Sequence, residues 1–548
     1  MPDPKDISKR RRRLAAAVAA VASLSAAAAT VLQAAPPLPP YLQAFPDFAP
    51  KVTPQMPGDV DIALKEKLEQ DKQFAKVQRE FDLDAWQMFV ALAWPTNNQG
   101  QPAPSLADTA FGPPHWTLWN NSSAIFQADG APPAACAPGR ARALALTRDL
   151  SKPVSRGLAA FSAKATTGVD TRKTRFLGVI SAVGELNAAR LSDIQQAFTG
   201  PLIDQNGEFV YYEIAIDPNE VGYICDNKLY NINGQVAFSQ AGGKVDMPFG
   251  TPNQDWSGSF ELKFAWKVLK PGKDDPSRFF TSPAVIFDQG PDGKPVERNV
   301  TVGLVGLHIG HKSQTSPQWI WATFEQVDNL AVDNVAHPTL SPSFFDASCP
   351  ICAVDLQPQT VNGVYPRVPT QVWRSIPIPP DKAALNSEAA AAFAKIGAVW
   401  QYYQLIDTQW PTSPKTAPSP WNGPLPDAVA NKPGGDPTPV FLTNVTMETY
   451  FQGGNEAACN AEELPNNVSC PANPPNWTSP LNNKPPAPAP VGSTQIFASE
   501  SCMGCHSSAG VYTSYDPKTQ QGTTSGQLTG DFSWLLTQKA QYQAPPGG

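Results

Sequence analysis

The sequence predicts an α+β protein, in which an antiparallel, β-rich centre is packed by helices and followed by a short C-terminal segment. Apolar residues recur at intervals of three and four between Asp59 and Leu92, which is the period of an amphipathic helix. Strand-like runs of apolar, β-branched and aromatic residues occupy the region from about 200 to 330. A proline-rich run from Thr478 to Val491 then predicts a stiff linker ahead of the last part of the chain.

Length and charge limit the possible functions. The 548 residues are enough for two or three domains, and the 59 prolines, about twice the usual share, predict long irregular connections. The formal net charge is −7, and loss of the N-terminal segment described next would remove six positive and two negative charges, leaving −11. Phosphate binding needs a clustered basic surface, so we expect no nucleic acid among the partners.

Residues 1–35 are predicted to be a signal peptide. A basic run, Lys9 to Arg13, precedes the alanine-rich apolar stretch from Leu14 to Val31, and small residues up to Ala35 offer several cleavage sites. A membrane anchor is the alternative, but this stretch is weakly hydrophobic, and no other segment approaches the roughly 20 apolar residues of a span. We therefore expect a periplasmic or secreted protein with no membrane span after cleavage.

The body, 58–445, begins after a proline-rich arm at 36–57. Its first helix is expected from Asp59 to Leu92, with a break near 81–84, and Pro95 ends it.

A second helical region is expected between Ala141 and Phe198, and the β-rich centre follows. The predicted strands are Phe209–Ile216, Phe260–Val268, Val300–His311 and Trp319–Glu325. In the second strand apolar residues alternate with Glu261, Lys263 and Lys267, so one of its faces is expected to meet water. Asp292-Gly293 indicates a hairpin turn.

The strongest chemical signal lies in the C-terminal segment, 493–548, where Ser501-Cys-Met-Gly-Cys-His506 has the spacing of a c-type haem attachment site. The thiols of Cys502 and Cys505 would form thioethers with two vinyl groups of the porphyrin, and His506 would be the proximal iron ligand. The alternatives are a chance Cys-x-x-Cys, a disulfide or half a zinc site, but no second pair has zinc spacing. We therefore expect one covalently bound haem c per chain.

The sixth iron ligand is not evident from the sequence. The 42 residues after His506 contain neither methionine nor histidine, although a small class I cytochrome c usually supplies methionine there. The haem is therefore expected to pack against the α+β body. Its sixth iron position would be occupied by a residue upstream of the motif, occupied by a non-protein ligand such as water, or vacant. His308 and His311 are the foremost candidates, but strand residues three apart face opposite ways and cannot share one metal. Their structural alternative is a hydrogen bond to backbone or to Glu325.

Other upstream residues are also candidates for the sixth ligand. They are His115, His337, Met88, Met247 and Met447. Short helices at Ile496–Glu500 and Phe532–Ala540 are expected to flank the haem motif.

Six further cysteines suggest disulfides in an oxidising compartment. The favoured arrangement, one of fifteen, is Cys459–Cys470 within the Pro/Asn-rich insertion and linker at 446–492, Cys136–Cys225 and Cys349–Cys352. Cys349-Pro-Ile-Cys352 has a second interpretation as a redox dithiol, because Cys-x-x-Cys loops tune the pKa of their thiols.

Several stretches of the chain occur in a recognisable combination. They are Trp86–Pro95, Phe209–Glu213, Leu229–Asn231, Val302–His308, Pro317–Asn329, Ser501–His506 and Asp531–Leu536. This combination resembles a family of secreted bacterial monohaem cytochrome c-type proteins. The resemblance covers most of the mature chain and implies haem and export. It implies no substrate, and only Cys502, Cys505 and His506 take a role from it.

Two functions remain open at this level. One is a periplasmic c-type cytochrome that transfers electrons, with an acidic body that docks redox partner proteins. The other is a haem-dependent oxidoreductase of peroxidase or oxygenase type with an open iron position, or the haem subunit of a dehydrogenase. A sixth ligand from the protein favours the first, and a five-coordinate or water-bound iron favours the second. No nucleophile elbow, phosphate loop or dinucleotide fingerprint appears in a suitable context.

Overall fold

The computed structural model describes residues 52–137, 172–178, 194–196, 199–252, 257–289, 295–331, 340–349, 352–374, 377–411, 442–452, 502–525 and 529–545. All of them belong to a single compact unit, 50–548. The expected signal peptide, the Cys459–Cys470 pair, His337, the hairpin turn at Asp292-Gly293, the helix at Ile496–Glu500 and the linker at 478–491 lie outside the described residues.

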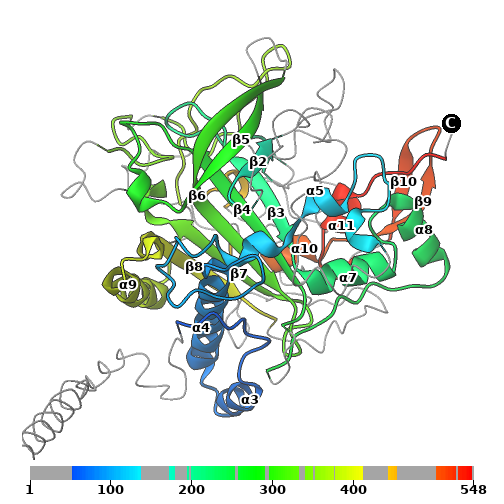
Figure 1. Ribbon diagram of the computed structural model, residues 1–548, viewed down its shortest axis with the longest axis horizontal. Helices are drawn as coiled ribbons and strands as arrows, with labels where there is room; N and C mark the ends of the chain where they lie inside the picture. The colour runs from blue at the N-terminus through cyan, green and yellow to red at the C-terminus, as the bar shows by residue number, and fades with distance from the viewer. Residues whose placement is uncertain are drawn as a thin grey trace, which may run out of the picture. The chain divides into compact units, whose positions relative to one another are not determined.

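A curled, eight-stranded sheet forms the centre of the described part of the chain (Figure 1). Its strands are β1 (Asn120–Asn121), β2 (Arg175–Gly178), β3 (Tyr211–Ile216), β4 (Phe260–Val268), β5 (Thr281–Gln289), β6 (Pro295–His311), β7 (Ile320–Gln326) and β8 (Tyr403–Gln409). The order is β1-β3-β4-β6-β5-β2, and β7 pairs with both β6 and β8. Among the described pairings only β2 with β5 is parallel. The predicted α+β body with an antiparallel-rich sheet is thus confirmed.

Strand β6 organises the sheet, because it is 17 residues long and has different neighbours along its length. Its first part pairs with β5, its last part pairs with β7, and β4 runs along the opposite edge. Lys263 of β4 lies directly across from His308 of β6, and His308 lies across from Thr323 of β7. Directly opposed residues project from the same side of a sheet, so these three side chains share one face. We call it the polar face.

The other face is an aromatic core, because the residues next to those three in sequence point the opposite way. Trp86 and Phe89 of the long helix α4 (Phe74–Ala93) contact Phe324 of β7, with ring centroids 5.0 and 4.5 Å apart. Trp116 contacts Phe264 of β4 at 5.3 Å. Burial of this face therefore fixes which side chains of the sheet are left for the polar face.

The first helical region differs in detail from the prediction. It consists of α3 (Ile62–Gln70) and α4, so the break lies at 71–73, where Lys72 has a left-handed φ of 55°, and not at 81–84 as predicted. The acidic residues at 81–84 do not interrupt the helix, because Asp82 is buried in an ion pair with Lys382 at 2.9 Å. The helix ends at Ala93, just before Pro95, as predicted.

Apart from α9, which has 16 residues, the remaining helices and one hairpin are short. They are η1 (His115–Leu118), α5 (Ser122–Ile125), η2 (Ala134–Cys136), α7 (Pro218–Asp226), α8 (Ile232–Gln240), η4 (Pro276–Arg278), η5 (Val327–Asn329), α9 (Pro380–Lys395), η6 (Val399–Tyr402), η8 (Thr449–Phe451), α10 (Cys502–His506), β9 (Tyr512–Asp516), β10 (Gln521–Thr524) and α11 (Leu535–Lys539). Figure 1 shows α4 and α9 beside β7 and β8, whereas α7, α8 and α11 gather near the β9–β10 hairpin. The expected closing helix at Phe532–Ala540 is thus present in shortened form.

The structure differs from the strand prediction at three points, and it also contains β5, which was not predicted. Residues 175–178 form β2, within a region predicted to be helical. The expected wet face of β4 is absent at its end, because Lys267 is buried in an ion pair with Asp274 at 2.5 Å. Strand β8 was not predicted, because Thr408 and Gln409 are polar yet completely buried and so hide the pattern of a buried strand.

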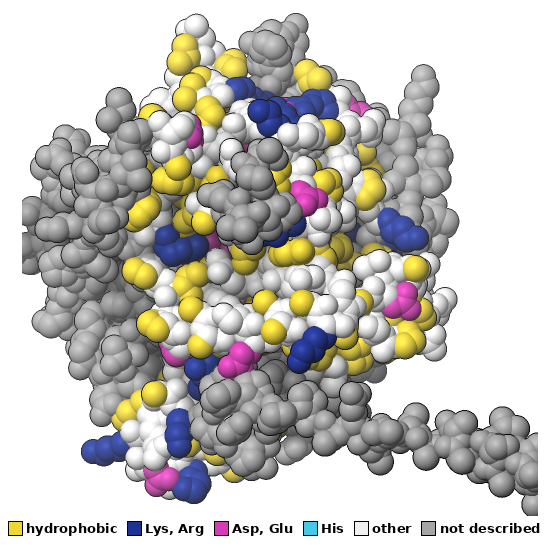
Figure 2. Space-filling model, turned by 90° about the vertical axis from the view of Figure 1, so that its left-hand side faces the viewer, with side chains coloured by type: hydrophobic (Ala, Val, Ile, Leu, Met, Phe, Trp, Pro, Cys, Tyr) yellow, Lys and Arg dark blue, Asp and Glu magenta, His cyan; other side chains and the backbone are white. Residues whose placement is uncertain are grey.

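The surface has no single dominant charge on the face shown in Figure 2. Basic and acidic side chains are spread over this face among apolar ones. Such an interspersed surface agrees with the composition, in which 41 basic residues are set against 48 acidic ones.

Candidate functional site

Helix α10 brings Cys502, Cys505 and His506, the Cys-x-x-Cys-His motif, together on one helical turn. Cys502 and Cys505 are three residues apart, so their side chains lie on the same side of the turn, and they carry thiols instead of forming a disulfide. The backbone N–H of Cys502 donates to the carbonyl of Leu442 at 3.4 Å, and that of Met503 donates to the Gln409 amide oxygen at 2.7 Å. The motif is therefore fixed to the end of β8.

The imidazole of His506 is oriented by a single backbone contact. Its Nδ1 lies 2.7 Å from the carbonyl oxygen of Phe532, and because a carbonyl only accepts, Nδ1 carries the proton. Nε2 then keeps its lone pair, which is the arrangement common to metal-binding histidines. Burial, reinforced by the nearby charges of His308 and Lys263 and partly offset by the bond to Phe532, lowers the pKa of His506 to about 4. The ring is neutral at neutral pH, as a metal ligand must be.

Two tryptophans border the motif. The ring centroid of Trp321 lies 4.2 Å from that of His506, and the indole N–H of Trp534 donates to the carbonyl of Cys505 at 3.1 Å. Trp321 stacks in turn on Trp319 at 5.9 Å. Gly310 of β6 allows this packing, because a Cβ there would lie 3.1 Å from the Trp321 ring. The site therefore has an aromatic wall built from β7.

A cluster of three ionisable side chains, Lys263, His308 and Glu448, lies within electrostatic reach of the motif on the polar face. Nε2 of His308 is 2.9 Å from a carboxylate oxygen of Glu448, whose other oxygen accepts the backbone N–H of Asn444 at 2.7 Å. The ammonium of Lys263 lies 5.1 Å from the ring centroid of Tyr212. We call Lys263, His308 and Glu448 the polar cluster.

The charges of the polar cluster and of the motif influence one another. Burial lowers the pKa of Lys263, although Glu448 opposes this. Burial acts to raise the pKa of Glu448, but His308 and Lys263 together hold it below its usual value. Burial and the negative charge of Glu448 raise the pKa of the Cys502 thiol well above its ordinary value. The Glu448 carboxylate is therefore ionised and the Cys502 thiol is protonated at neutral pH.

One segment, Leu442–Gln452, joins the motif to the sheet. Leu442 accepts the bond from Cys502, and Asn444 donates its amide to the Thr323 hydroxyl at 2.8 Å. The segment lies close above β6, since a Cβ on Gly306 would be 2.2 Å from the Thr446 hydroxyl. It thus places Glu448 over His308 and supports α10 at the same time.

The two strand histidines have different environments. The ring of His311 is completely buried, stacks on Phe260 with centroids 4.0 Å apart, and bonds through Nε2 to the carbonyl of Ser257 at 2.7 Å. His311 therefore has the expected structural role, with a backbone partner. His308 also has a hydrogen-bond partner, but it is Glu448 and not Glu325, whose carboxylate instead accepts from Arg374 at 3.2 Å.

The remaining candidate ligands lie in packed surroundings. His115 has a pKa lowered to about 4 by burial and by Arg172, and its ring meets that of Trp119 at 6.2 Å. Met88 is buried in α4, and Met447 belongs to a hydrophobic cluster under the Leu442–Gln452 segment. Met247 shares the hydrophobic cluster that also contains Met503, Trp321 and Phe532.

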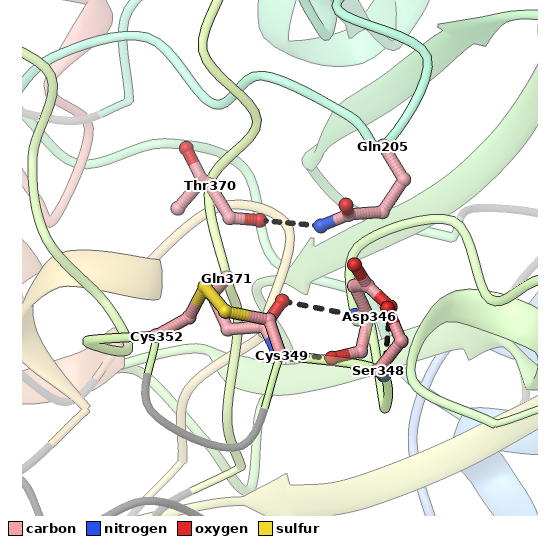
Figure 3. The surroundings of a disulfide bond; sticks show 7 residues. All are labelled: Gln205, Asp346, Ser348, Cys349, Cys352, Thr370 and Gln371. Atoms are coloured by element: carbon pink, nitrogen blue, oxygen red, sulfur yellow. Dashed lines mark hydrogen bonds between the residues drawn. A yellow bond between two sulfur atoms is a disulfide. The ribbon is translucent and has the colours of Figure 1, made fainter.

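Two of the three expected disulfides fall within the described residues, and both are present. Cys136 is joined to Cys225, 89 residues away, and Cys349 is joined to Cys352 (Figure 3).

The described residues contain no group of three or more His, Cys, Asp or Glu side chains arranged to hold a metal ion. In the same part of the chain, no helix combines the length and the apolar content needed to cross a membrane.

Sequence reasoning missed Lys263, Trp321, Phe532 and Glu448 as members of the site. Glu448 is 140 residues from His308, and nothing local in the sequence connects the two. Lys263 could have been found only from the register of β4 on β6, because it is a polar residue that alternates with apolar ones like many others.

No family model, curated protein or solved structure matches the chain. A functional assignment therefore depends on the residues of the site.

Proposed function

We propose that this protein is a periplasmic or secreted bacterial c-type cytochrome that carries one covalent haem and transfers electrons. The observation that carries the proposal is the hydrogen bond from Nδ1 of His506 to Phe532, which directs the Nε2 lone pair of a neutral imidazole outward from the same helical turn as two thiols. These are the three groups that a c-type haem needs, and all three come from five consecutive residues.

The residues around the motif have roles that suit a haem. Bound haem would supply an iron that gains and loses one electron. Cys502 and Cys505 would anchor it through thioethers, His506 would ligate the iron, and Phe532 would hold the imidazole in the required tautomer. Trp321 covers one side of the His506 ring and so keeps water from it. Exclusion of water and fixed ligand geometry are the usual means by which a protein sets a haem potential.

His308 is the proposed protein ligand for the sixth position, in preference to His311. Glu448 binds Nε2 of His308 and leaves Nδ1 buried without a hydrogen bond among the described residues. A ring nitrogen opposite a carboxylate-bound one is the usual metal-binding atom of a histidine. The charge of His308 also reaches His506, whereas the ring of His311 is enclosed by Phe260 and Ser257.

A second function is favoured by the polar cluster itself. An ammonium, an imidazole and a carboxylate beside a haem could deliver protons to a small ligand on an open iron position. This arrangement suits a haem-dependent oxidoreductase, or the haem subunit of a dehydrogenase, in which His308 stays bonded to Glu448 and does not ligate.

Redox partner proteins are the expected partners of the electron carrier. The chain has a formal charge of −7, so a partner with a basic docking surface would associate faster at low ionic strength.

The test is maturation of the full chain in a host that attaches c-type haem. The wild type is expected to keep haem on a denaturing gel and to give the pyridine haemochrome spectrum of two thioether bonds. Cys502→Ala is expected to lose one thioether, which shifts that spectrum, whereas Cys349→Ser, in the Cys-x-x-Cys pair without a following histidine, should keep both. A wild-type chain without covalent haem would refute the proposal.

Absorption and EPR spectra of the haem protein then separate the two functions. A low-spin ferric signal from two protein ligands identifies the electron carrier. A high-spin signal, with rapid binding of cyanide or peroxide, identifies the oxidoreductase.

A further inference from the structure

We propose that the Cys349–Cys352 disulfide is a second, reducible redox site that exchanges two electrons with a dithiol. This inference goes beyond the proposed haem function and does not depend on it. Four features of the described residues support it: two partly exposed cysteines, a frame that does not need the disulfide, a very short covalent loop, and a contrasting second disulfide in the same chain.

Cys349 and Cys352 are only partly buried, as Cys136 and Cys225 also are, so exposure alone does not distinguish the two bridges. Cys349 and Cys352 are three residues apart, with Cα atoms separated by 5.4 Å. Thiol–disulfide exchange requires a direct approach to one sulfur, so partial exposure is a precondition for it.

A hydrogen-bonded frame holds the base of the loop independently of the sulfur atoms (Figure 3). The side-chain amide of Gln371 accepts from the backbone N–H of Asp346 at 2.9 Å and donates to its carbonyl at 2.8 Å. The Asp346 carboxylate accepts from the N–H and the hydroxyl of Ser348 at 2.8 and 2.6 Å. The N–H of Cys349 donates to the Asp346 carbonyl at 3.2 Å. Reduction breaks none of these bonds, so the two thiols stay together and can close again.

The Cys349–Cys352 disulfide is expected to contribute less to the stability of the fold than the Cys136–Cys225 disulfide. A disulfide stabilises mainly by restricting the unfolded chain, and this effect grows with the length of the closed loop. Cys349–Cys352 spans three residues, whereas Cys136–Cys225 spans 89 and packs against the large hydrophobic cluster that contains Ile224 and Tyr230. A structural role is thus well supported for the long bridge and poorly supported for the short one.

The proposed reaction converts one disulfide and one dithiol into one dithiol and one disulfide. A thiolate of the donor attacks one sulfur of the pair and forms a mixed disulfide, the Cys349–Cys352 bond breaks, and the released thiolate takes up a proton. The second thiol of the donor, as its thiolate, then attacks the mixed disulfide, forms the donor's own disulfide and releases the second cysteine. The donor, a protein or small-molecule dithiol, is oxidised by two electrons. Cys349 and Cys352 gain two electrons and two protons.

The test uses the folded, full-length protein and dithiothreitol as the probe dithiol. After timed exposure the reaction is stopped with acid, new thiols are alkylated, and peptide mass spectrometry measures each cysteine separately. We expect Cys349 and Cys352 to be reduced at least about tenfold faster than Cys136 and Cys225, with an unchanged near-UV circular dichroism spectrum. Equal rates for the two bridges, or reduction only when the spectrum of the folded state is lost, would overturn the proposal.

A pair of variants tests the frame. Gln371→Ala removes both bonds to Asp346, whereas Gln359→Ala removes an exposed amide that contacts only the Gln357 carbonyl. Gln371→Ala is expected to shift the equilibrium with dithiothreitol toward the dithiol by about threefold or more, because its thiols are held less closely. An equal shift in Gln359→Ala would contradict the frame. If Gln371→Ala does not fold, the wild-type rates still decide the proposal, and haem content is measured on the separate peptide that carries Cys502 and Cys505.

Discussion

His308 and Glu448 form a hydrogen-bonded pair across 140 residues of sequence, with 2.9 Å between Nε2 and the carboxylate oxygen. The pair joins the central strand of the sheet to the segment that also supports α10. It therefore links the polar face of the sheet to the segment that holds the Cys-x-x-Cys-His motif.

The first prediction separates His308 from His311. In the haem protein, His308→Ala is expected to replace the low-spin ferric EPR signal with a high-spin one, and Glu448→Gln to do so in part, because it weakens the bond that orients the ring. His311→Ala is the control, because it removes the other strand histidine without altering the polar cluster. The EPR spectrum of this variant should stay low-spin. A low-spin signal that persists in His308→Ala would exclude His308 as the ligand.

The second prediction concerns Trp321, whose ring lies 4.2 Å from that of His506. Trp321→Leu opens the motif to water, which favours the more highly charged ferric state, so the reduction potential should fall by an amount on the order of tens of millivolts. Trp321→Phe keeps an aromatic cover and should keep most of the potential. Potentiometric titration of the three proteins makes the comparison, and equal potentials would show that Trp321 does not shield the haem.

The third prediction is a dependence of stability on pH that originates in α4. Glu80 is 1% exposed, its carboxylate has no hydrogen-bond partner among the described residues, and burial followed by the charge of Asp61 raises its pKa to about 8. The pKa of Glu80 is higher in the folded than in the unfolded chain, so the protonated carboxyl group favours the folded state. This contribution to the free energy of unfolding is complete below about pH 4.5 and is lost as the pH rises through 8.

Glu80→Gln removes this loss. Urea unfolding should show the variant to be more stable than the wild type at pH 9, by an amount on the order of 2–4 kcal/mol, with a difference that shrinks toward pH 4. Glu66→Gln, on the exposed side of α3, is the matched control and should follow the wild type at every pH. A constant difference between Glu80→Gln and wild type across the pH range would contradict the explanation.

The fourth prediction compares the two disulfides. From the lengths of the closed loops, replacing Cys136 and Cys225 by serine should cost about 4–5 kcal/mol of unfolding free energy, and replacing Cys349 and Cys352 about 2 kcal/mol. Chemical denaturation of both double variants measures the two costs. Equal costs would show that the short bridge stabilises the folded state by means other than loop closure.

The parts of the fold that follow from local patterns could be predicted from the sequence. Strand β4 alternates apolar and polar residues, and α4 has a helical period that ends before Pro95, so β4 and the C-terminal end of α4 were located closely. Strand β8 could not be predicted, because burial of its polar residues Thr408 and Gln409 depends on hydrogen-bond partners far away in the chain.

The candidate site divides in the same way. Cys502, Cys505 and His506 are adjacent in sequence and need no fold to be recognised. Glu448 and Trp321 join them only through the register of β6 on β7 and the placement of a segment more than 100 residues downstream of β7. Contacts of that kind depend on tertiary structure, which no short window of sequence encodes.

The enclosure of Met503 bears on the order in which the proposed haem protein would mature. Its side chain is completely buried, Gln409 binds its backbone, and burial of the neighbouring Cys502 raises the pKa of that thiol well above its usual value. An α10 docked in this way would present a protonated, poorly nucleophilic thiol to an enzyme that attaches haem. We therefore expect attachment of the proposed haem to precede docking of the C-terminal end, and a chain that docks first to need partial unfolding before it can be loaded.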